Sequence, residues 1–572
     1  MPTSSSPNLD KRRDLAAWSA LFVLVMGLHT HVISQPFTKM DDVRFILENP
    51  QITKPTSQPL MDLIMTPGIG YIVPVTSNVE AALFWLGGGA PWPFHLVGLL
   101  LHALMAALTY SLARRLACSP LAAFLAASLF AVHPITVEPF AWATGLKDLL
   151  MANFALAATL MVLRAFRCSQ ESNEKSVRVW LTLAVTATLL SVLSKPTGAL
   201  VPLAWAGYLV QVRRRGEVVP PVFCRAITLL VLVSLVITAA SFHMHSELLD
   251  TDAAIGSGGA HFFMALGHQT QHLLWPLDLL PRYAVNRLAG YSDPHVYFGM
   301  CVLLLVVAVV WFARRRAEVL FALALAVCGY LPVSNLLPFA RMVADSYLYL
   351  PLSTSLVAVA VWLKELPWPR LRKGFALVAF ALVAVLGWRG HDQSQRWASA
   401  VALWYPAIDA SDDPQWQHYP WMMMAEGLQF AGEFERSVSA WEQTFTRAYV
   451  PSYLDSFAFA QVSAGNFDEA ECLMIEDVHF GGHPPVSKYN LGVLYLMKID
   501  RAPRYPGYGI EPLWWVGSEV EARRLKLEPL LASRLGPRLD QLVAAWGKHE
   551  PPPPWEFRSC ASLHVTKSDA RP

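Results

Sequence analysis

The sequence predicts an all-α protein that crosses a membrane about eleven times and ends in a smaller domain of helical repeats. Of its 572 residues, 54% are hydrophobic and only 15% are charged, whereas a soluble protein has about 25% charged residues. The hydrophobic residues are gathered in long runs, as in membrane-spanning helices. Beyond Trp388 the charge density rises and a short motif recurs, which is typical of stacked helix pairs.

Apolar segments define the expected membrane domain, residues 1–390. Several are shorter than the ~20 residues that cross a bilayer as a helix, so we expect some of them to tilt together or to be lengthened by polar ends. The expected bounds of the eleven segments are 14–34, 94–113, 119–132, 147–165, 179–194, 196–212, 223–241, 297–313, 317–333, 347–363 and 374–388.

Basic clusters between the apolar segments predict the orientation. With eleven spans, every cluster falls on one side, which the positive-inside rule assigns to the cytoplasm. The opposite side then receives two large loops, residues 35–93 and 242–296, and the chain after Trp388. Short cytoplasmic loops and the absence of any Asn-x-Ser/Thr acceptor favour a bacterial inner membrane, with the repeat domain in the periplasm. The clusters are Lys11 to Arg13, Arg114-Arg115, Arg164 to Arg178, Arg213 to Arg215, Arg314 to Arg316 and Lys364 to Lys373.

Residues 391–548 form the expected repeat domain. The segment Ala431 to Arg436 recurs 33 residues later as Ala464 to Glu469, a spacing close to the 34-residue tetratricopeptide (TPR) period. The first helix of a third copy is predicted at Ser487 to Met497. Such repeats stack into a concave surface that binds an extended peptide or a partner protein. The Pro-rich tail, residues 549–572, is expected to be extended or disordered.

Groups of residues within residues 14–390 resemble, in chain order, the transmembrane-and-tetratricopeptide-repeat-containing (TMTC-like) O-mannosyltransferase family. The third group, around a His-Pro turn, is the most similar. The repeat tail agrees with the same family architecture. The five groups are Asp41 to Arg44 with Asn49-Pro50; Phe94 to Leu96 with Leu100 to Ala103; His133 to Trp142 with Gly145 to Leu150; Leu193 to Gly198; and Leu331 to Asn335 with Ala344 to Pro351.

This resemblance implies a membrane-embedded glycosyltransferase of the GT-C class. Such enzymes take a sugar from a polyprenyl-phosphate carrier and invert its anomeric configuration, with no cofactor and no metal. The family analogy favours mannose as the sugar and Ser or Thr of an exported protein as the acceptor, with the repeats guiding the polypeptide. The sequence contains no P-loop and no Rossmann fingerprint, which argues against direct use of a nucleotide sugar or ATP.

The acidic pair Asp41-Asp42 is the expected catalytic centre. A carboxylate at a membrane boundary is a functional candidate, and the resemblance places the general base in the first non-cytoplasmic loop. An acceptor hydroxyl becomes a good nucleophile when a carboxylate takes its proton. We favour Asp41 as the base, because related enzymes use the first acid of their pair, with Asp42 positioning acceptor or base. The alternative is that the pair caps a helix N-terminus.

Cationic side chains are expected to stabilise the negative charge that grows on the departing phosphate, and Arg is suited to bidentate phosphate contact. The family carries an Arg before Tyr-Leu-Tyr, where this chain has Asp345-Ser346 followed by Tyr347. Arg341, about one helical turn earlier, is expected to reach the same place. The candidates on the expected non-cytoplasmic side are Lys147, Lys195, Arg282, Arg287 and Arg341.

Three further features admit a structural as well as a functional interpretation. Lys147 either contacts phosphate or pairs with Glu138 or Asp148. His133 and Glu138 lie on a Pro-rich turn, where a hydrogen bond that holds the turn is as reasonable as a catalytic role. His268 and His272 have the i, i+4 spacing of metal ligands on a helix, but the sequence places no third ligand beside them.

Two other functions compete with the glycosyltransferase. A non-catalytic membrane scaffold that recruits partners through its repeats would tolerate replacement of Asp41 and Asp42. A transporter would carry paired charges near the middle of its spans, whereas here the charges concentrate at the ends of the apolar segments. No basic arm for nucleic acid occurs.

Overall fold

The computed structural model describes residues 7–54, 72–246, 259–336, 341–364, 369–411 and 413–480. Over these ranges the chain forms helices and turns and contains no strand, which confirms the expected all-α class. The chain divides into two compact units, Met1–Leu403 and Trp404–Pro572. The domain boundary expected near residue 390 falls inside a single helix, α16 (Pro369–Arg396).

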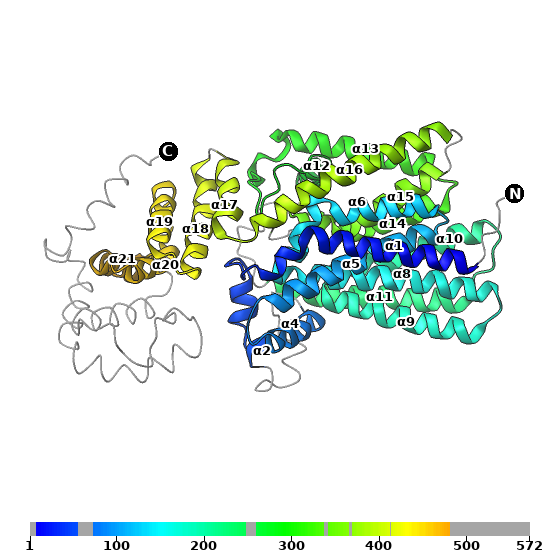
Figure 1. Ribbon diagram of the computed structural model, residues 1–572, viewed down its shortest axis with the longest axis horizontal. Coiled ribbons are helices and arrows are strands. Elements are labelled where there is room, and N and C mark those ends of the chain that lie inside the picture. The colour runs from blue at the N-terminus through cyan, green and yellow to red at the C-terminus, as the bar shows by residue number, and fades with distance from the viewer. Residues whose placement is uncertain are drawn as a thin grey trace. The chain divides into compact units, whose positions relative to one another are not determined.

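Each expected apolar segment forms a helix, and eight helices of the described ranges are long and apolar enough to cross a membrane. Figure 1 shows α1, α5, α8 and α9 side by side, and each packs on the next along this series. The long helices are α1 (Pro7–His29), α5 (Trp92–Arg115), α8 (Leu146–Gln170), α9 (Glu174–Ser194), α11 (Pro221–Ser246), α13 (Pro294–Phe312), α15 (Tyr349–Lys364) and α16.

The remaining three expected segments form shorter helices, as expected for several of the eleven. They are α6 (Pro120–Val132), α10 (Val201–Arg214) and α14 (Ala317–Tyr330). After α6 the chain bends by 62° into Pro134–Ala141, and this bent pair counts as a ninth span if it is taken as one crossing. A short 3₁₀ turn that contains a Pro residue adjoins each of these three helices.

Prolines decide where several helices stop. The residue before a proline is disfavoured in the α-helical conformation. His133 and Lys195, each followed by Pro, accordingly have extended backbones with ψ of 127°. Their side chains therefore stand at helix ends, not along a span. The short elements are η1 (Thr30–Ser34), η4 (Pro134–Thr136), α7 (Val137–Ala141), η5 (Ala143–Gly145), η6 (Pro196–Leu200), η8 (Arg287–Ser292), η9 (Leu331–Val333) and η10 (Asp345–Leu348).

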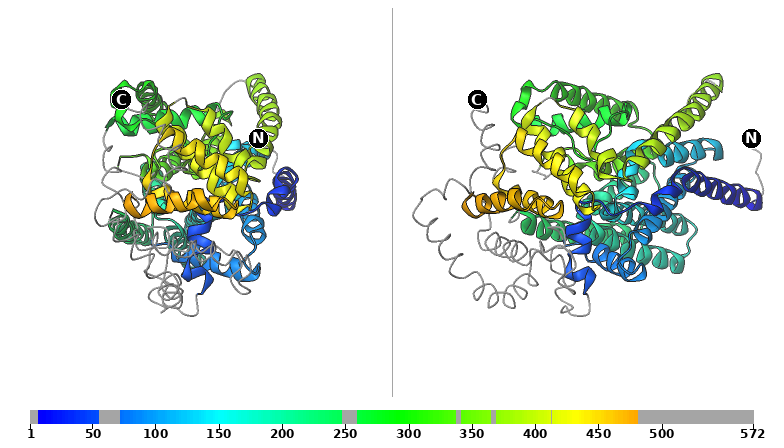
Figure 2. Two further views of the ribbon diagram at one scale, coloured as in Figure 1. Left: turned by 90° about the vertical axis from the view of Figure 1, so that its left-hand side faces the viewer. Right: turned by 60° about the vertical axis from the view of Figure 1, so that its left-hand side comes forward.

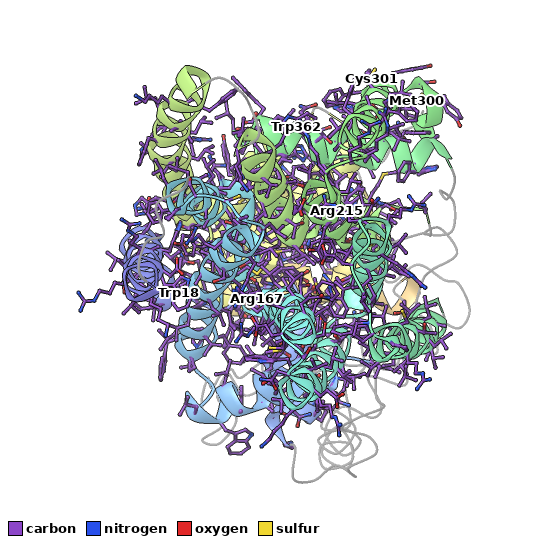
Figure 3. The ribbon with its side chains drawn as sticks, turned by 90° about the vertical axis from the view of Figure 1, so that its right-hand side faces the viewer. Trp18, Arg167, Arg215, Met300, Cys301 and Trp362 are labelled. Carbon is purple, nitrogen blue, oxygen red and sulfur yellow. The ribbon has the colours of Figure 1, made fainter. Side chains whose placement is uncertain are left out.

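Basic residues gather at one end of the membrane unit. Figure 3 looks onto this end, where Arg167 from α8 and Arg215 after α10 are both labelled. Arg215 forms an ion pair of 2.7 Å with Glu318 at the start of α14. Two of the basic clusters thus share an end, as alternating spans require.

The two large loops fold into shorter helices. The first forms η2 (Val43–Leu47), α2 (Pro50–Thr53) and α4 (Pro74–Leu86), and the second forms α12 (Gly259–Leu274), which packs on α13. Figure 2 shows that the Pro369 end of α16 stands away from the other helices. Only 11% of the apolar part of this helix, within Lys373–Arg396, is buried. Residues 55–71 and 247–258 of these loops lie outside the described ranges.

The second unit consists of helix pairs with the predicted spacing. Gly432 and Gly465, 33 residues apart in sequence, have positive φ angles of 79° and 86°, a conformation that glycine adopts without strain. Each glycine lies in the turn of a pair, and Trp441 stacks on Phe457 between them with 6.1 Å between ring centroids. The helices are α17 (Ala400–Asp409), α18 (Pro414–Phe430), α19 (Phe434–Arg447), η11 (Pro451–Tyr453), α20 (Leu454–Ser463) and α21 (Phe467–Phe480). The third copy and the Pro-rich tail lie outside the described residues, and the TPR assignment stays a prediction.

Candidate active site

Asp42 is a fully buried carboxylate with four hydrogen-bond donors around it. Its Oδ1 accepts from the backbone N–H and the hydroxyl of Thr144 at 2.9 and 2.6 Å. Its Oδ2 accepts from the N–H and the hydroxyl of Thr38 at 2.9 and 3.0 Å. Burial raises the pKa of Asp42, and these hydrogen bonds act in the opposite direction because they favour the charged form. With every lone pair in use, Asp42 ties the first loop to the start of α8.

Asp41 has a different environment, although it is the next residue. It is only partly buried, and no hydrogen bond reaches its carboxylate from the part of the chain that the structure describes. Burial raises the pKa of Asp41, while the positive charges of Lys147 and Arg341 lower it in part. Asp41 is thus an available proton acceptor within electrostatic reach of two cations.

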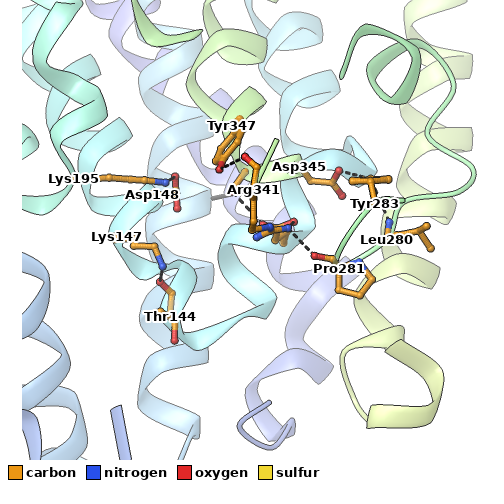
Figure 4. A network of polar contacts seen from close by, with 12 residues as sticks. Thr144, Lys147, Asp148, Lys195, Leu280, Pro281, Tyr283, Arg341, Asp345 and Tyr347 are labelled. Carbon is orange, nitrogen blue, oxygen red and sulfur yellow. Dashed lines mark hydrogen bonds and ion pairs between the residues drawn. The ribbon is translucent and has the colours of Figure 1, made fainter. Parts of the chain in front are cut away.

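Lys147 belongs to the first turn of α8 and is buried. Its Nζ donates to the carbonyl of Thr144 at 2.9 Å and lies 4.8 Å from the ring centroid of Trp142. Of the two interpretations of Lys147, the ion pair with Glu138 or Asp148 is not formed, because each of these carboxylates pairs with another cation. Asp148 accepts from Lys195 at 2.6 Å, and both of those side chains are buried (Figure 4).

Arg341 and Glu138 form the second ion pair of this region, in which Glu138 is buried and Arg341 is partly buried. The two guanidinium N–H groups donate to both Glu138 oxygens, at 3.0 and 3.4 Å, and one also donates to the carbonyl of Pro281 at 2.7 Å. The hydroxyl of Ser346 donates to the same Glu138 carboxylate at 3.1 Å. Arg341 and Ser346 therefore share one acceptor, as expected if Arg341 reaches the place of the missing family Arg. Burial acts to lower the pKa of Arg341, but the Glu138 charge and its hydrogen bonds raise it, and the pKa ends above its ordinary value.

Asp345 and Tyr347 continue this network on opposite sides of Arg341, with Asp345 toward Tyr283 and Tyr347 toward Lys195 (Figure 4). The Tyr283 hydroxyl donates to Asp345 at 2.6 Å, and the Tyr347 hydroxyl donates to the backbone carbonyl of Arg341 at 3.0 Å. Tyr347 also lies under Lys195, with the Nζ 5.6 Å from its ring centroid. Tyr347 thus contacts both cations, whereas Asp345 holds Tyr283.

Two expected site residues have structural surroundings. His133 Nδ1 accepts from the N–H of Ile135, and its Nε2 contacts the carbonyl of Leu273 at 3.1 Å. It thereby closes the turn after α6 and links it to α12. Arg282 is partly buried between Pro281 and Tyr283, both of which belong to the network around Arg341. The side chain of Arg287 lies outside the described residues.

Sequence reasoning missed Glu80 and underestimated Trp142. Glu80 is buried on α4, and burial raises its pKa to about 8, with Lys147 lowering it. Trp142 has Lys147 and Arg341 at 4.8 and 5.8 Å from its ring centroid, and it stacks on Trp397. A lone Glu within the apolar run of α4 and a Trp inside the most similar motif were the available signals.

The arrangement offers one proton acceptor and a small group of cations around one aromatic ring. Such a site can deprotonate a hydroxyl and stabilise a phosphate that leaves from the opposite face of a sugar. The hydrogen-bonded partner of each cation fixes its position before substrate arrives.

Comparison with known proteins agrees with the motifs. Residues 73–241 match the family described as dolichyl-phosphate-mannose-protein mannosyltransferase. The chain is 37% identical over 139 residues to protein O-mannosyl-transferase TMTC4 of Homo sapiens, which is 22% of this chain and 19% of that protein. It is 40% identical over 107 residues to Tmtc2 of Drosophila melanogaster, covering 18% and 11%. It is 22% identical over 404 residues to F38B6.6 of Caenorhabditis elegans, covering 66% and 56%.

These matches cover less than two thirds of each relative's length. Among solved structures, the chain is similar to the archaeal oligosaccharyltransferase AglB from Archaeoglobus fulgidus, in complex with an inhibitory peptide and a dolichol-phosphate. The TM-score is 0.43 at 12% identity, over 84% of this chain and 72% of that one. The chain therefore resembles TMTC-type protein O-mannosyltransferases, and its matching region includes Lys147 and Glu138.

Proposed function

We propose that this protein is an inverting membrane glycosyltransferase. It moves a mannose-like hexose from a polyprenyl-phosphate carrier to a hydroxyl group, with Ser or Thr of an exported protein as the acceptor. The observation that carries this proposal is the contrast between two adjacent carboxylates. Asp42 is held by four hydrogen bonds, whereas Asp41 is available and lies near Lys147 and Arg341.

Asp41 is the proposed general base. A base works best when its pKa lies near the working pH, and burial raises the pKa of Asp41 toward that range. Asp42 is a positioning residue, because its bonds to Thr38 and Thr144 fix the backbone that carries Asp41. The cap interpretation of the pair is not needed, since Asp42 has no side-chain hydrogen bond to the helix that follows it.

Lys147 and Arg341 are the proposed ligands of the leaving phosphate. In this role Arg341 replaces the Arg that the family carries at the position of Ser346. The shared acceptor Glu138 supports this assignment, because it brings both side chains to one point. Lys195 is the less direct candidate, because its side chain is only 7% exposed in its ion pair with Asp148, whereas the side chain of Arg341 is 22% exposed in its pair with Glu138.

The donor is proposed to approach from the periplasmic side of a bacterial inner membrane, with the repeat unit on that side as well. The basic end that carries Arg167 and Arg215 then faces the cytoplasm, as the positive-inside rule requires. In this orientation the repeats present the acceptor polypeptide to the site. The chemistry needs no metal ion at the reacting phosphate.

The test uses the purified full-length chain in lipid nanodiscs, with a polyprenyl-phosphate mannose donor and a periplasmic extract as acceptor. Mass spectrometry measures hexose on peptides, and hydrolysis by an α- or β-specific mannosidase reports the anomer. We expect transfer with inversion, lost in Asp41→Asn while the protein remains folded. Asp392→Asn, an exposed acid on α16, is the matched control and retains transfer.

The scaffold hypothesis predicts the opposite result. No transfer with any polyprenyl-phosphate sugar, together with wild-type behaviour of Asp41→Asn in cells, would favour a protein that recruits partners through its repeats. Retention of the anomeric configuration would also reject the proposal, because a single displacement at the sugar inverts it.

A further inference from the structure

His268 of α12 meets two residues at the start of α13, Asp293 and His295. The nitrogen of each imidazole and a carboxylate oxygen lie within 4.8 Å of one another. His268 Nε2 is 3.7 Å from Asp293 Oδ2, and His295 Nδ1 is 2.8 Å from Asp293 Oδ1. A tetrahedral zinc ion with bonds of about 2.0–2.1 Å holds its ligand atoms about 3.4 Å apart. The two imidazole rings are stacked with 3.5 Å between their centroids, so one of them must turn about its side-chain bonds before both nitrogens face the same ion.

The backbone holds these residues together rigidly. α12 and α13 cross at Gly267 and Gly299, where an added Cβ would come within 2.1 Å of the His295 carbonyl and 1.9 Å of the Phe263 carbonyl. Only glycine permits so close an approach. Asp293 also caps α13, since its Oδ1 accepts from the N–H of His295 at 2.8 Å. The three side chains are thus placed by the fold before any ligand is bound.

The hydrogen bonding of the cluster is incomplete without a cation. His268 Nε2 is buried and has no hydrogen-bond partner. His295 has an oxygen at 2.8 Å from each nitrogen, Asp293 Oδ1 and Gln271 Oε1. A neutral imidazole has a single N–H, so it can donate to only one of these two oxygens. At the other contact the unprotonated nitrogen faces an oxygen, two acceptors together, unless Gln271 turns its amide. A metal on Asp293 and Nδ1 of His295 removes this conflict, because Nε2–H then donates to Gln271.

We propose that His268, Asp293 and His295 form a binding site for a divalent transition metal of the zinc class. Two imidazoles and one carboxylate suit Zn²⁺, which takes three protein ligands and a water when its fourth position is open. The side chains are 12%, 13% and 27% exposed, so water reaches the fourth position. Gln271 acts as the outer partner that orients His295.

This site differs from the metal pair that spacing alone suggests. His272 is one turn after His268, but it stacks on Tyr283 with 4.0 Å between ring centroids, and it is 6.2 Å from the His268 ring. His272 is therefore not a ligand. His272 stacks on Tyr283, which donates to Asp345. Tyr283 lies in the same segment as Pro281, whose carbonyl accepts from Arg341. The proposed metal is therefore structural: it fixes the α12–α13 helix pair, which packs against this segment.

The test uses the tag-free full-length protein, stripped with a chelator and titrated with Co²⁺ and Zn²⁺ against a chromophoric competitor. We expect one equivalent to bind, with the visible bands of tetrahedral Co²⁺ and an increase in thermal stability on addition of Zn²⁺. His268→Ala and His295→Ala should weaken binding by a hundredfold or more, since even outer partners contribute about 10–100-fold. Asp293→Asn keeps a side-chain acceptor for the helix cap, so its loss of affinity reports ligation and not folding.

Two other histidines of α12 serve as controls for this test. His272→Ala and His261→Ala, on the same helix, should bind the metal as the wild type does. Unchanged affinity in His268→Ala and Asp293→Asn would place the ion elsewhere and overturn the proposal. Failure of the wild-type protein to bind Zn²⁺ or Co²⁺ at micromolar concentration would overturn it as well. Neither outcome depends on glycosyl transfer.

Discussion

Replacing Asp42 by Asn tests the structural role of this carboxylate. The four donors of Thr38 and Thr144 divide equally between its two oxygens. An amide keeps one oxygen and turns its NH₂ group toward the other two donors. Two charge-assisted hydrogen bonds are lost, at about 1.5–3 kcal/mol each. The expected loss in free energy of unfolding is therefore about 3–6 kcal/mol, a large part of the ~5–15 kcal/mol of a typical domain.

The same change at Asp41 should behave differently. Its carboxylate accepts no hydrogen bond within the described residues, so Asp41→Asn should leave the free energy of unfolding within about 1 kcal/mol. Transfer should fall by about 10²–10⁴-fold, the usual contribution of a general base. Unfolding in mixed micelles and transfer to peptide, measured on the same preparations, separate the two effects.

A matched control and a clear refutation complete this test. Thr38→Ser keeps both donors to Asp42 and should retain stability and transfer. The reasoning is refuted if Asp42→Asn unfolds at the wild-type denaturant concentration but lacks transfer, while Asp41→Asn is active. In that case Asp42 would be the base, despite its saturated hydrogen bonding.

Three further changes probe the cations and the repeats. Lys147→Met removes a positive charge that lowers the pKa of Asp41. In a profile of kcat/KM against pH, activity rises as the base loses its proton, and this rise should move to higher pH. If the rise stays at the same pH, the charge of Lys147 does not act on the base. Arg341→Met should lower kcat by about 10²–10³-fold, as when one transition-state donor is removed. Adding Ser346→Arg to this variant should restore part of the loss when both are measured with the same donor. If nothing is restored, Arg341 does not take the place of the family Arg. Trp441→Ala should destabilise the repeat unit by about 3–5 kcal/mol, measured by thermal unfolding. Transfer to a short peptide should stay intact, because the repeats are proposed to guide a long acceptor polypeptide. Loss of transfer to the short peptide would contradict this role of the repeats.

The sequence was sufficient to predict the helices, because apolar runs and prolines determine them locally. His133-Pro134 and Lys195-Pro196 end helices where expected, and the repeat glycines stand at the predicted turns. Several of the eleven apolar segments were expected to be short, and within the described residues eight helices are long enough to cross a membrane, since 3₁₀ turns end the others early. Asp41 and Asp42 were also identifiable, because a charged pair after an apolar run is visible locally.

Pairing between distant residues was not predictable in the same way. Glu138 and Arg341 are 203 positions apart, and only packing of the bundle decides that Glu138 takes Arg341 and not Lys147. Likewise Lys195, not Lys147, neutralises Asp148. The two other members of the His268 cluster, Asp293 and His295, come from the start of another helix, so i, i+4 spacing pointed to the wrong partner. Local sequence contains no information on these choices.

The hydrogen bonds of Asp42 also bear on how the protein is made. Asp42 is synthesised 102 residues before its partner Thr144. Glu138 is synthesised 203 residues before its partner Arg341. Until those later helices are inserted, the first loop carries a buried-to-be charge with half of its donors absent. Glu138 then lacks the cation that it pairs with in the finished protein, although Lys195 can already pair with Asp148. The proposed base and the two proposed phosphate ligands come together only when the last of them, Arg341, has been made.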